Sequence, residues 1–117
     1  MINGVHTMFY SSQADELRAF LRDTLGFPAT DVGGGWLIFK MPPTEMGCHP
    51  AEANDGAPSG THYISFICDD VHGTVAELRA RGVQFVDEVN DVGYGLAIHF
   101  LAPGELTLEL YQPSYKL

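Results

Sequence analysis

The chain has 117 residues, of which 45% are hydrophobic and 18% charged, the composition of one globular domain. Lys and Arg number 6 against 15 Asp and Glu, for a formal net charge of −9. This balance excludes a nucleic-acid or anionic-membrane partner of the usual kind, because both recruit basic patches. We recognise no apolar membrane span and no secretion leader, so we expect a cytoplasmic protein with free thiols at Cys48 and Cys68.

The first half of the chain predicts a βαβββ unit. Val5–Tyr10 alternates in polarity like a half-buried strand. Apolar side chains then recur at helical spacing up to Leu25, with Ser11 or Ser12 as the expected N-cap and Gly26 as the end of the helix. Three short strands are expected to follow, at Ala29–Val32, Trp36–Met41 and Glu45–His49.

The second half predicts the same order of elements. Thr61–Cys68 is the expected first strand, and Asp69 or Asp70 caps a helix that Gly82 terminates. Three further strands are expected at Gln84–Val89, Gly95–Leu101 and Leu106–Tyr111. Residues 51–59 form the expected linker between module one (1–50) and module two (60–117) of a single domain spanning 1–117. The sequence thus predicts an α+β fold in which two βαβββ modules form a curved mixed sheet around a cleft.

An internal repeat relates the two halves. Asp31–Ile38 reappears sixty positions later as Asp91–Ile98, with the same Asp-Val-Gly opening. Gly4–His6 is matched by Gly60–His62 at a similar separation. The shared order and near-constant spacing of these short matches indicate a duplication.

The repeat brings four ligand-type side chains to equivalent places. His6 and His62 occupy the first strand of each module, and His49 and Glu109 occupy the last strands. A pseudo-twofold arrangement converges these four on one point. Three imidazoles and a carboxylate suit Zn, Fe, Ni, Co or Mn better than Ca or Mg. A slip of one residue would replace His49 by Cys48, and this alternative stays open.

Two further residues are candidates for catalysis. In Leu106–Tyr111 the leucines alternate with Glu109, so we expect the leucines to face the helix and Glu109 to face the cleft. Tyr111 shares the face of Glu109, where it either orients substrate or forms part of the wall. His99 lies on the strand expected next to the last one, as either a proton shuttle or an ordinary packed ring.

The sequence resembles the vicinal oxygen chelate superfamily, which includes glyoxalase, bleomycin-resistance proteins and extradiol dioxygenases. The resemblance spans nearly the whole chain and is carried by Gly4–Met8, Gly60–His62 and Ala102–Leu110. It implies metal ligands from the first and last strands of each module, here His6, His49, His62 and Glu109. The chain departs from the family pattern at His49, where glyoxalase-type enzymes usually carry Glu, and in the turn before Glu109, which lacks the usual aspartates.

The resemblance implies a glyoxalase-like metalloenzyme. A divalent metal (Zn, Ni, Fe, Co or Mn) would hold a small oxygen-rich substrate for proton transfer of the lyase or isomerase type. Four protein ligands leave two octahedral positions for such a substrate, whereas two His and one Glu suit an Fe(II) extradiol-type dioxygenase. A metal-free antibiotic- or metabolite-binding resistance protein is the alternative from another class. The family also implies a homodimer, in which one site can draw ligands from both chains.

Overall fold

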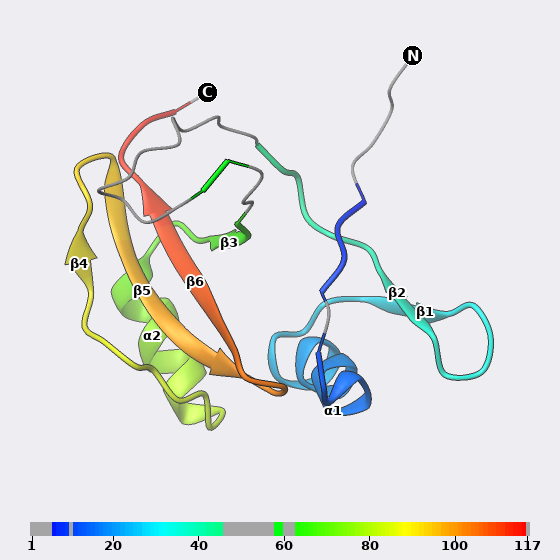
Figure 1. Ribbon diagram of the computed structural model, residues 1–117. Coiled ribbons are helices and arrows are strands. Elements are labelled where there is room, and N and C mark those ends of the chain that lie inside the picture. Colours follow the sequence, from blue (N-terminus) through cyan, green and yellow to red (C-terminus); the bar gives the residue numbers. More distant parts are fainter. Residues whose placement is uncertain (1–5, 10, 46–57, 60–62, 117) are drawn as a thin grey trace, which may run out of the picture.

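The protein combines helices and strands in an α+β fold, as predicted. The computed structural model describes residues 6–9, 11–45, 58–59 and 63–116 (Figure 1). Its helices are α1 (Ala14–Ala19), the π-helical η1 (Phe20–Thr24) and α2 (Val71–Ala80). Its strands are β1 (Ala29–Asp31), β2 (Leu37–Phe39), β3 (Ser65–Ile67), β4 (Asn90–Asp91), β5 (Gly95–Ala102) and β6 (Leu106–Pro113).

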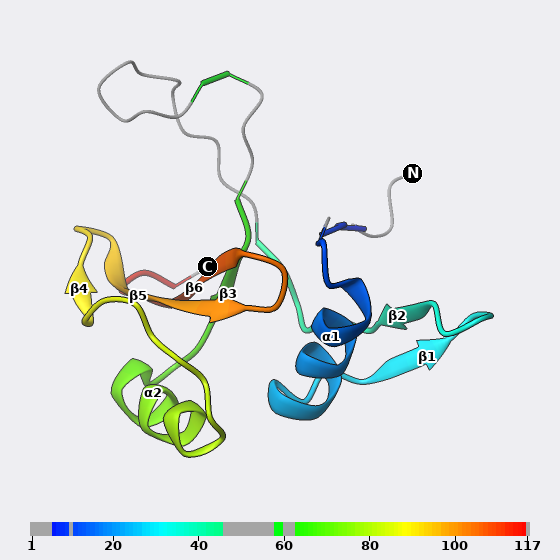
Figure 2. The same cartoon turned by 60° about the horizontal axis from the view of Figure 1, so that its bottom comes forward.

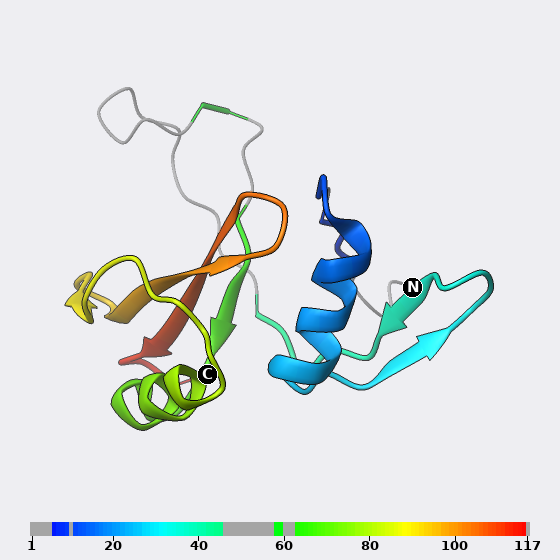
Figure 3. The ribbon, with the colours of Figure 1, turned by 90° about the horizontal axis from the view of Figure 1, so that it is seen from below.

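The larger sheet has the strand order β3-β6-β5-β4. β3 runs parallel to β6, and the other pairs are antiparallel, so the sheet is mixed as predicted; it is open rather than closed. Helix α2 covers one face of this sheet (Figure 2). β1 and β2 form a separate antiparallel hairpin, and α1 stands between this hairpin and the larger sheet (Figure 3). No helix in the described part of the chain is long and apolar enough to span a membrane.

Local sequence signals account for α2. The Asp70 carboxylate accepts a hydrogen bond from the backbone N–H of Gly73 at 3.1 Å, so Asp70 is the N-cap. Val71, Val75 and Leu78 follow at helical spacing, are buried and face the sheet. They form one core with the inward side chains of β5 and β6, namely Ile98, Phe100, Ala102, Leu108 and Leu110.

Helix α1 joins the same core through Leu17, as η1 does through Leu21. Its predicted serine cap is wrong, because the helix begins at Ala14 and has no side-chain cap. The Ser11 hydroxyl instead donates to the Pro103 carbonyl at 3.0 Å, in the turn between β5 and β6. Ser11 therefore ties the segment before α1 to the turn between β5 and β6 rather than capping a helix.

The internal repeat is visible in two matching turns. The Asp31 carboxylate accepts a hydrogen bond from the N–H of Gly33 at 2.8 Å. The Asp91 carboxylate accepts one from Gly93 at the same distance. Each Asp–Gly pair thus closes the same turn between successive strands, which supports the duplication.

Two predicted strands are corrected. Residues 6–9 of Val5–Tyr10 lie in no strand, because an alternating pattern indicates a face but supplies no hydrogen-bonding partner. Residues 84–89 contribute only a bridge between Phe85 and Phe100, before β4 begins at Asn90. The ladder breaks there because the N–H of His99 donates to the Asp87 carboxylate at 2.8 Å instead of to a backbone carbonyl.

The remaining strands are shorter than predicted or shifted at their ends. β1, β2 and β3 lie inside the expected ranges, and β6 extends two residues further, to Pro113. In the predicted strand Glu45–His49, Glu45 lies in no strand, and the other four residues lie outside the described part of the chain.

Candidate functional site

The larger sheet has one face without a helical cover in the described part of the chain (Figures 1 and 2). We call this the open face. In β6, Leu108 and Leu110 are buried on the α2 side, and Glu109 lies between them on the open face with a side chain 31% exposed. The prediction that the leucines and Glu109 lie on opposite faces of the sheet is confirmed. It follows from the two-residue period of a strand.

The Glu109 carboxylate is held from both neighbouring strands. On β3, the Ser65 hydroxyl donates to Oε1 at 2.6 Å, because Ser65 is the register partner of Glu109 in the parallel pair. On β5, His99 is the antiparallel partner, and its Nε2 lies 3.1 Å from Oε2. Strand register alone therefore gathers a carboxylate, an imidazole and a hydroxyl at one point.

Asp87 holds the other side of His99. Its carboxylate accepts the His99 backbone N–H and lies 2.7 Å from the ring atom Nδ1. Partial burial opposes the charged carboxylate, but both contacts with His99 favour it, and together they lower the pKa of Asp87. Asp87, His99 and Glu109 thus form a continuous polar chain.

Sequence reasoning missed Asp87 and Ser65. Asp87 and Glu88 interrupt the apolar run 85–89, and acids within a predicted strand are the signal that was available. Ser65 carries no signal of its own. It becomes recognisable only once β3 is known to run parallel to β6.

Tyr111 lies on the same face, but its hydroxyl is already engaged. The ring is buried, with 6% exposure, and the hydroxyl donates to the Tyr94 carbonyl at 3.0 Å. The Tyr111 ring can pack against β5 because residue 95 is a glycine. A Cβ added to Gly95 would lie 2.6 Å from the Tyr111 ring and 2.5 Å from the Gln112 carbonyl oxygen. In this arrangement the Tyr111 hydroxyl holds the turn that carries Tyr94.

The predicted metal ligands are only partly within the described chain. Glu109 lies on the open face. His6 is exposed, and residues 6–9 lie apart from β6 in all three views (Figures 1, 2 and 3). His49 and His62 lie outside the described residues, as does Cys48. Within the described residues, no group of three His, Cys, Asp or Glu side chains is arranged to hold a metal ion.

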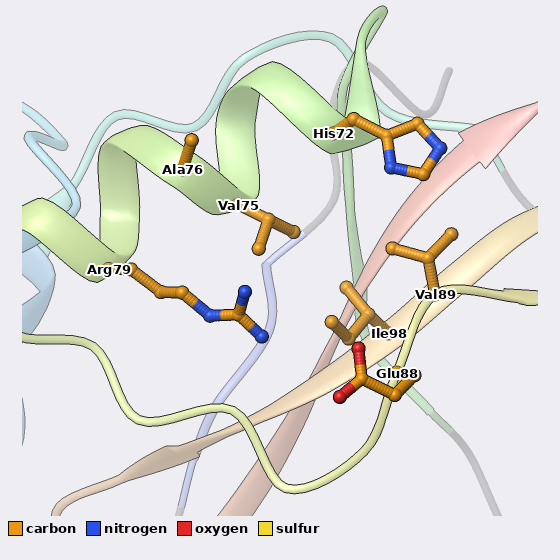
Figure 4. Close-up of a pocket in the computed structure, with 7 residues that line it drawn as sticks. All are labelled: His72, Val75, Ala76, Arg79, Glu88, Val89 and Ile98. Atoms are coloured by element: carbon orange, nitrogen blue, oxygen red, sulfur yellow. The ribbon is translucent and has the colours of Figure 1, made fainter.

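A cavity of about 300 Å³ lies on the other side of the sheet, beside α2 (Figure 4). Arg79 and Glu88 reach into it from opposite walls, and Ile98 of β5 forms part of its floor. Because Ile98 points away from the open face, this cavity is separate from the Glu109 cluster. His72, in the first turn of α2, lines its rim and is exposed.

Sequence comparison places the chain in a family. The sequence model of the glyoxalase/bleomycin resistance protein/dioxygenase superfamily matches residues 5–110. The chain therefore belongs to this superfamily, as the motifs predicted. Members of this superfamily bind small molecules, often use divalent metals and often form dimers.

Individual relatives agree with this assignment. The uncharacterized protein YetH of Bacillus subtilis (strain 168) is 27% identical over 108 residues, which cover 86% of this chain and 90% of that protein. The antibiotic-binding protein TnmS3 from Streptomyces sp. CB03234 is similar in structure, with a TM-score of 0.63 and 22% identity over 97% of this chain and 100% of that one. Lactoylglutathione lyase from Agrobacterium tumefaciens has a TM-score of 0.62 and 19% identity, over 91% and 90%. At these identities the structures establish the fold alone.

Proposed function

We propose that the protein is a glyoxalase-like metalloenzyme in which a divalent metal binds a small oxygen-rich substrate for lyase- or isomerase-type proton transfer. The observation that carries the proposal is the placement of Glu109. A carboxylate stands on the open face of the sheet, partly exposed, with an imidazole 3.1 Å away. An acid-base group beside a ligand-type carboxylate is what metal-assisted proton transfer requires.

The donor chemistry of Glu109 fits a metal ion. An ionised carboxylate has about four acceptor positions, and Ser65 and His99 occupy one on each oxygen. The carboxylate can therefore take a metal without losing either contact. In the proposed site Glu109 would hold Zn, Ni, Fe, Co or Mn together with His6, His49 and His62, and because His6 lies apart from β6, the proposed homodimer would supply these ligands from both chains. The metal would supply polarisation of the oxygen atoms of the substrate.

His99 is the proposed proton-transfer group. Its Nε2 faces the site beside Glu109, and Asp87 fixes the orientation of the ring by holding Nδ1 and the backbone N–H. Because the ring is already held in this orientation, little further conformational entropy is lost when a proton is transferred at Nε2. Tyr111 contributes the wall next to this point.

Titration of the metal-free protein with Co²⁺, followed by visible absorption, tests the ligand set. We expect the unaltered protein to bind one Co²⁺ per proposed site, and His62→Ala and Glu109→Gln to lose this binding. His72→Ala is the matched control, because it removes an exposed histidine outside the proposed set and should bind Co²⁺ normally. Stoichiometric binding by His62→Ala would contradict the assignment.

A metal-free binding protein is the second candidate. The observation in its favour is the aromatic character of the open face, where Tyr94 is 59% exposed beside the Tyr111 ring. Aromatic walls are typical of small-molecule binding sites, and the structural relative TnmS3 is described as an antibiotic-binding protein. The Co²⁺ titration separates the candidates, because a pure binder takes up no metal with any of the four proposed ligands.

We also propose a homodimer. Apolar side chains are exposed on and around the β1–β2 hairpin, with Val32 63% and Trp36 49% exposed. An exposed apolar cluster of this kind is typical of a surface that pairs with another protein. Light scattering is expected to give twice the mass of one chain, and Trp36→Glu to reduce it to that of one chain. A monomeric unaltered protein would refute this proposal.

A further inference from the structure

Three tyrosine rings meet at one end of the open face, where β5 begins and β6 ends. Tyr94 and Tyr111 have ring centroids 5.7 Å apart with planes at 64°, and Tyr111 and Tyr115 are 6.4 Å apart at 46°. Tyr111 is buried in the middle, and the outer rings of Tyr94 and Tyr115 are 59% and 41% exposed. The rings are therefore inclined to one another and reach solvent at their outer members.

A carboxylate completes this group. The Tyr115 hydroxyl donates to Glu45 Oε1 at 3.0 Å, although the two residues are 70 positions apart. The Tyr111 hydroxyl and the Glu45 carboxylate both help to raise the pKa of Tyr115, so its phenol stays neutral. The chain as a whole carries a formal net charge of −9. The electrostatic environment of the three rings thus favours a cation.

The backbone is shaped to hold these rings. Tyr111 crosses β5 at Gly95, the position where an added Cβ would collide with the ring. The Tyr94 carbonyl accepts both the Tyr111 hydroxyl and the Ser114 N–H, each at 3.0 Å. The turn that carries Tyr94 and the strand end that leads to Tyr115 are therefore locked together. The arrangement is ordered before any ligand arrives, which lowers the cost of binding.

We propose that Tyr94, Tyr111, Tyr115 and Glu45 form a binding site for an organic ammonium cation, of the quaternary or methylated kind. Aromatic faces attract such cations through the ring quadrupole, and an alkylated ammonium loses little hydration on binding. The neighbouring carboxylate adds attraction and excludes anions. This site contains none of the proposed metal ligands, so its test does not depend on the metal chemistry. It shares Tyr94 and Tyr111 with the second candidate function and in that respect rests on it.

Choline is a suitable probe, and 3,3-dimethyl-1-butanol is its neutral counterpart of nearly the same shape. Binding to the full-length, metal-free protein is followed by NMR at constant ionic strength, from the choline methyl signal and from the tyrosine ring signals. We expect choline to bind with a dissociation constant in the millimolar range, with its methyl signal shifted upfield by the rings. The neutral alcohol should bind at least about fivefold more weakly, because a cation–π contact contributes about that factor at a partly exposed site.

Substitutions of the exposed Tyr94 ring should not disturb folding, so they test binding separately from stability. Tyr94→Leu should weaken choline binding by about fivefold, whereas Tyr94→Phe, which keeps the ring, should stay within about twofold. Glu45→Gln should weaken choline binding and leave binding of the neutral alcohol unchanged. Equal affinity for choline and the alcohol would overturn the proposal. So would choline binding by Tyr94→Leu at the unaltered affinity, or no choline binding at all.

Discussion

Gly95→Ala tests whether close packing of β5 under Tyr111 positions the open face. An added Cβ would lie 2.5 Å from the Gln112 carbonyl oxygen, 2.6 Å from Tyr111 Cε1 and 3.1 Å from Pro113 Cα. Two of these three atoms belong to the backbone of β6, which cannot withdraw without loss of ladder hydrogen bonds. Overpacking of this kind costs about 2 kcal/mol. With a urea dependence of about 1.5 kcal/mol per M, the unfolding midpoint should fall by about 1.3 M.

Urea unfolding and the NMR signals of the Tyr111 ring provide the assay. Gly93→Ala is the control, because its φ of +95° strains any side chain but nothing lies within 4 Å of the added Cβ. It should lower stability by about 1–2 kcal/mol without moving the Tyr111 ring. Gly95→Ala should both lower stability and shift the ring signals. A Gly95→Ala protein with the unaltered midpoint and an unshifted ring would refute this packing.

Two further predictions concern polar contacts. The lowered pKa of Asp87 means that its charged form stabilises the fold above the unfolded-state pKa, and that this contribution disappears as the pH falls through the folded-state pKa. Asp87→Asn should therefore lower the free energy of unfolding by less than about 1 kcal/mol at pH 7, measured by urea unfolding, because the pair with His99 is partly exposed. At strongly acidic pH the substitution should not change the free energy of unfolding. A destabilisation that grows as the pH falls would contradict this prediction. Arg81 donates to the Thr24 carbonyl at 3.0 Å and to Glu77 at 2.7 Å, which ties η1 to α2. Arg81→Met should lower the free energy of unfolding by about 1 kcal/mol, and an unchanged thermal midpoint would show that this tie is dispensable.

The parts of the fold that local pattern determines could be predicted from the sequence. Helix α2 follows from the Asp70 cap, its apolar stripe and the terminating Gly82, whose φ is +89°. The face of Glu109 follows from strand alternation, and its nearness to His99 from the expected neighbouring strand. These inferences need only the period of one element and the order of the elements.

The parts that depend on distant partners could not be predicted. Residues 6–9 alternate like a strand but lie in none, because the pattern does not reveal a pairing partner. Ser11 looks like a cap and instead donates to the carbonyl of Pro103, 92 residues further along the chain. Asp87 breaks its own predicted strand by accepting the His99 N–H, a choice between side-chain and backbone acceptors that only the folded register decides. The four-ligand set remains a prediction, because His49 and His62 lie outside the described residues.

The metal content of the untagged protein, purified without added metal, tests the account most directly. Elemental analysis should find about one Zn, Ni, Fe, Co or Mn per proposed site, and the same preparation of Glu109→Gln should contain far less. The identity of the metal would then separate proton transfer from oxygenation, because Fe(II) favours the latter. Metal-free protein that takes up none of these ions after dialysis would contradict the metalloenzyme, and would leave a small-molecule binder on the same fold.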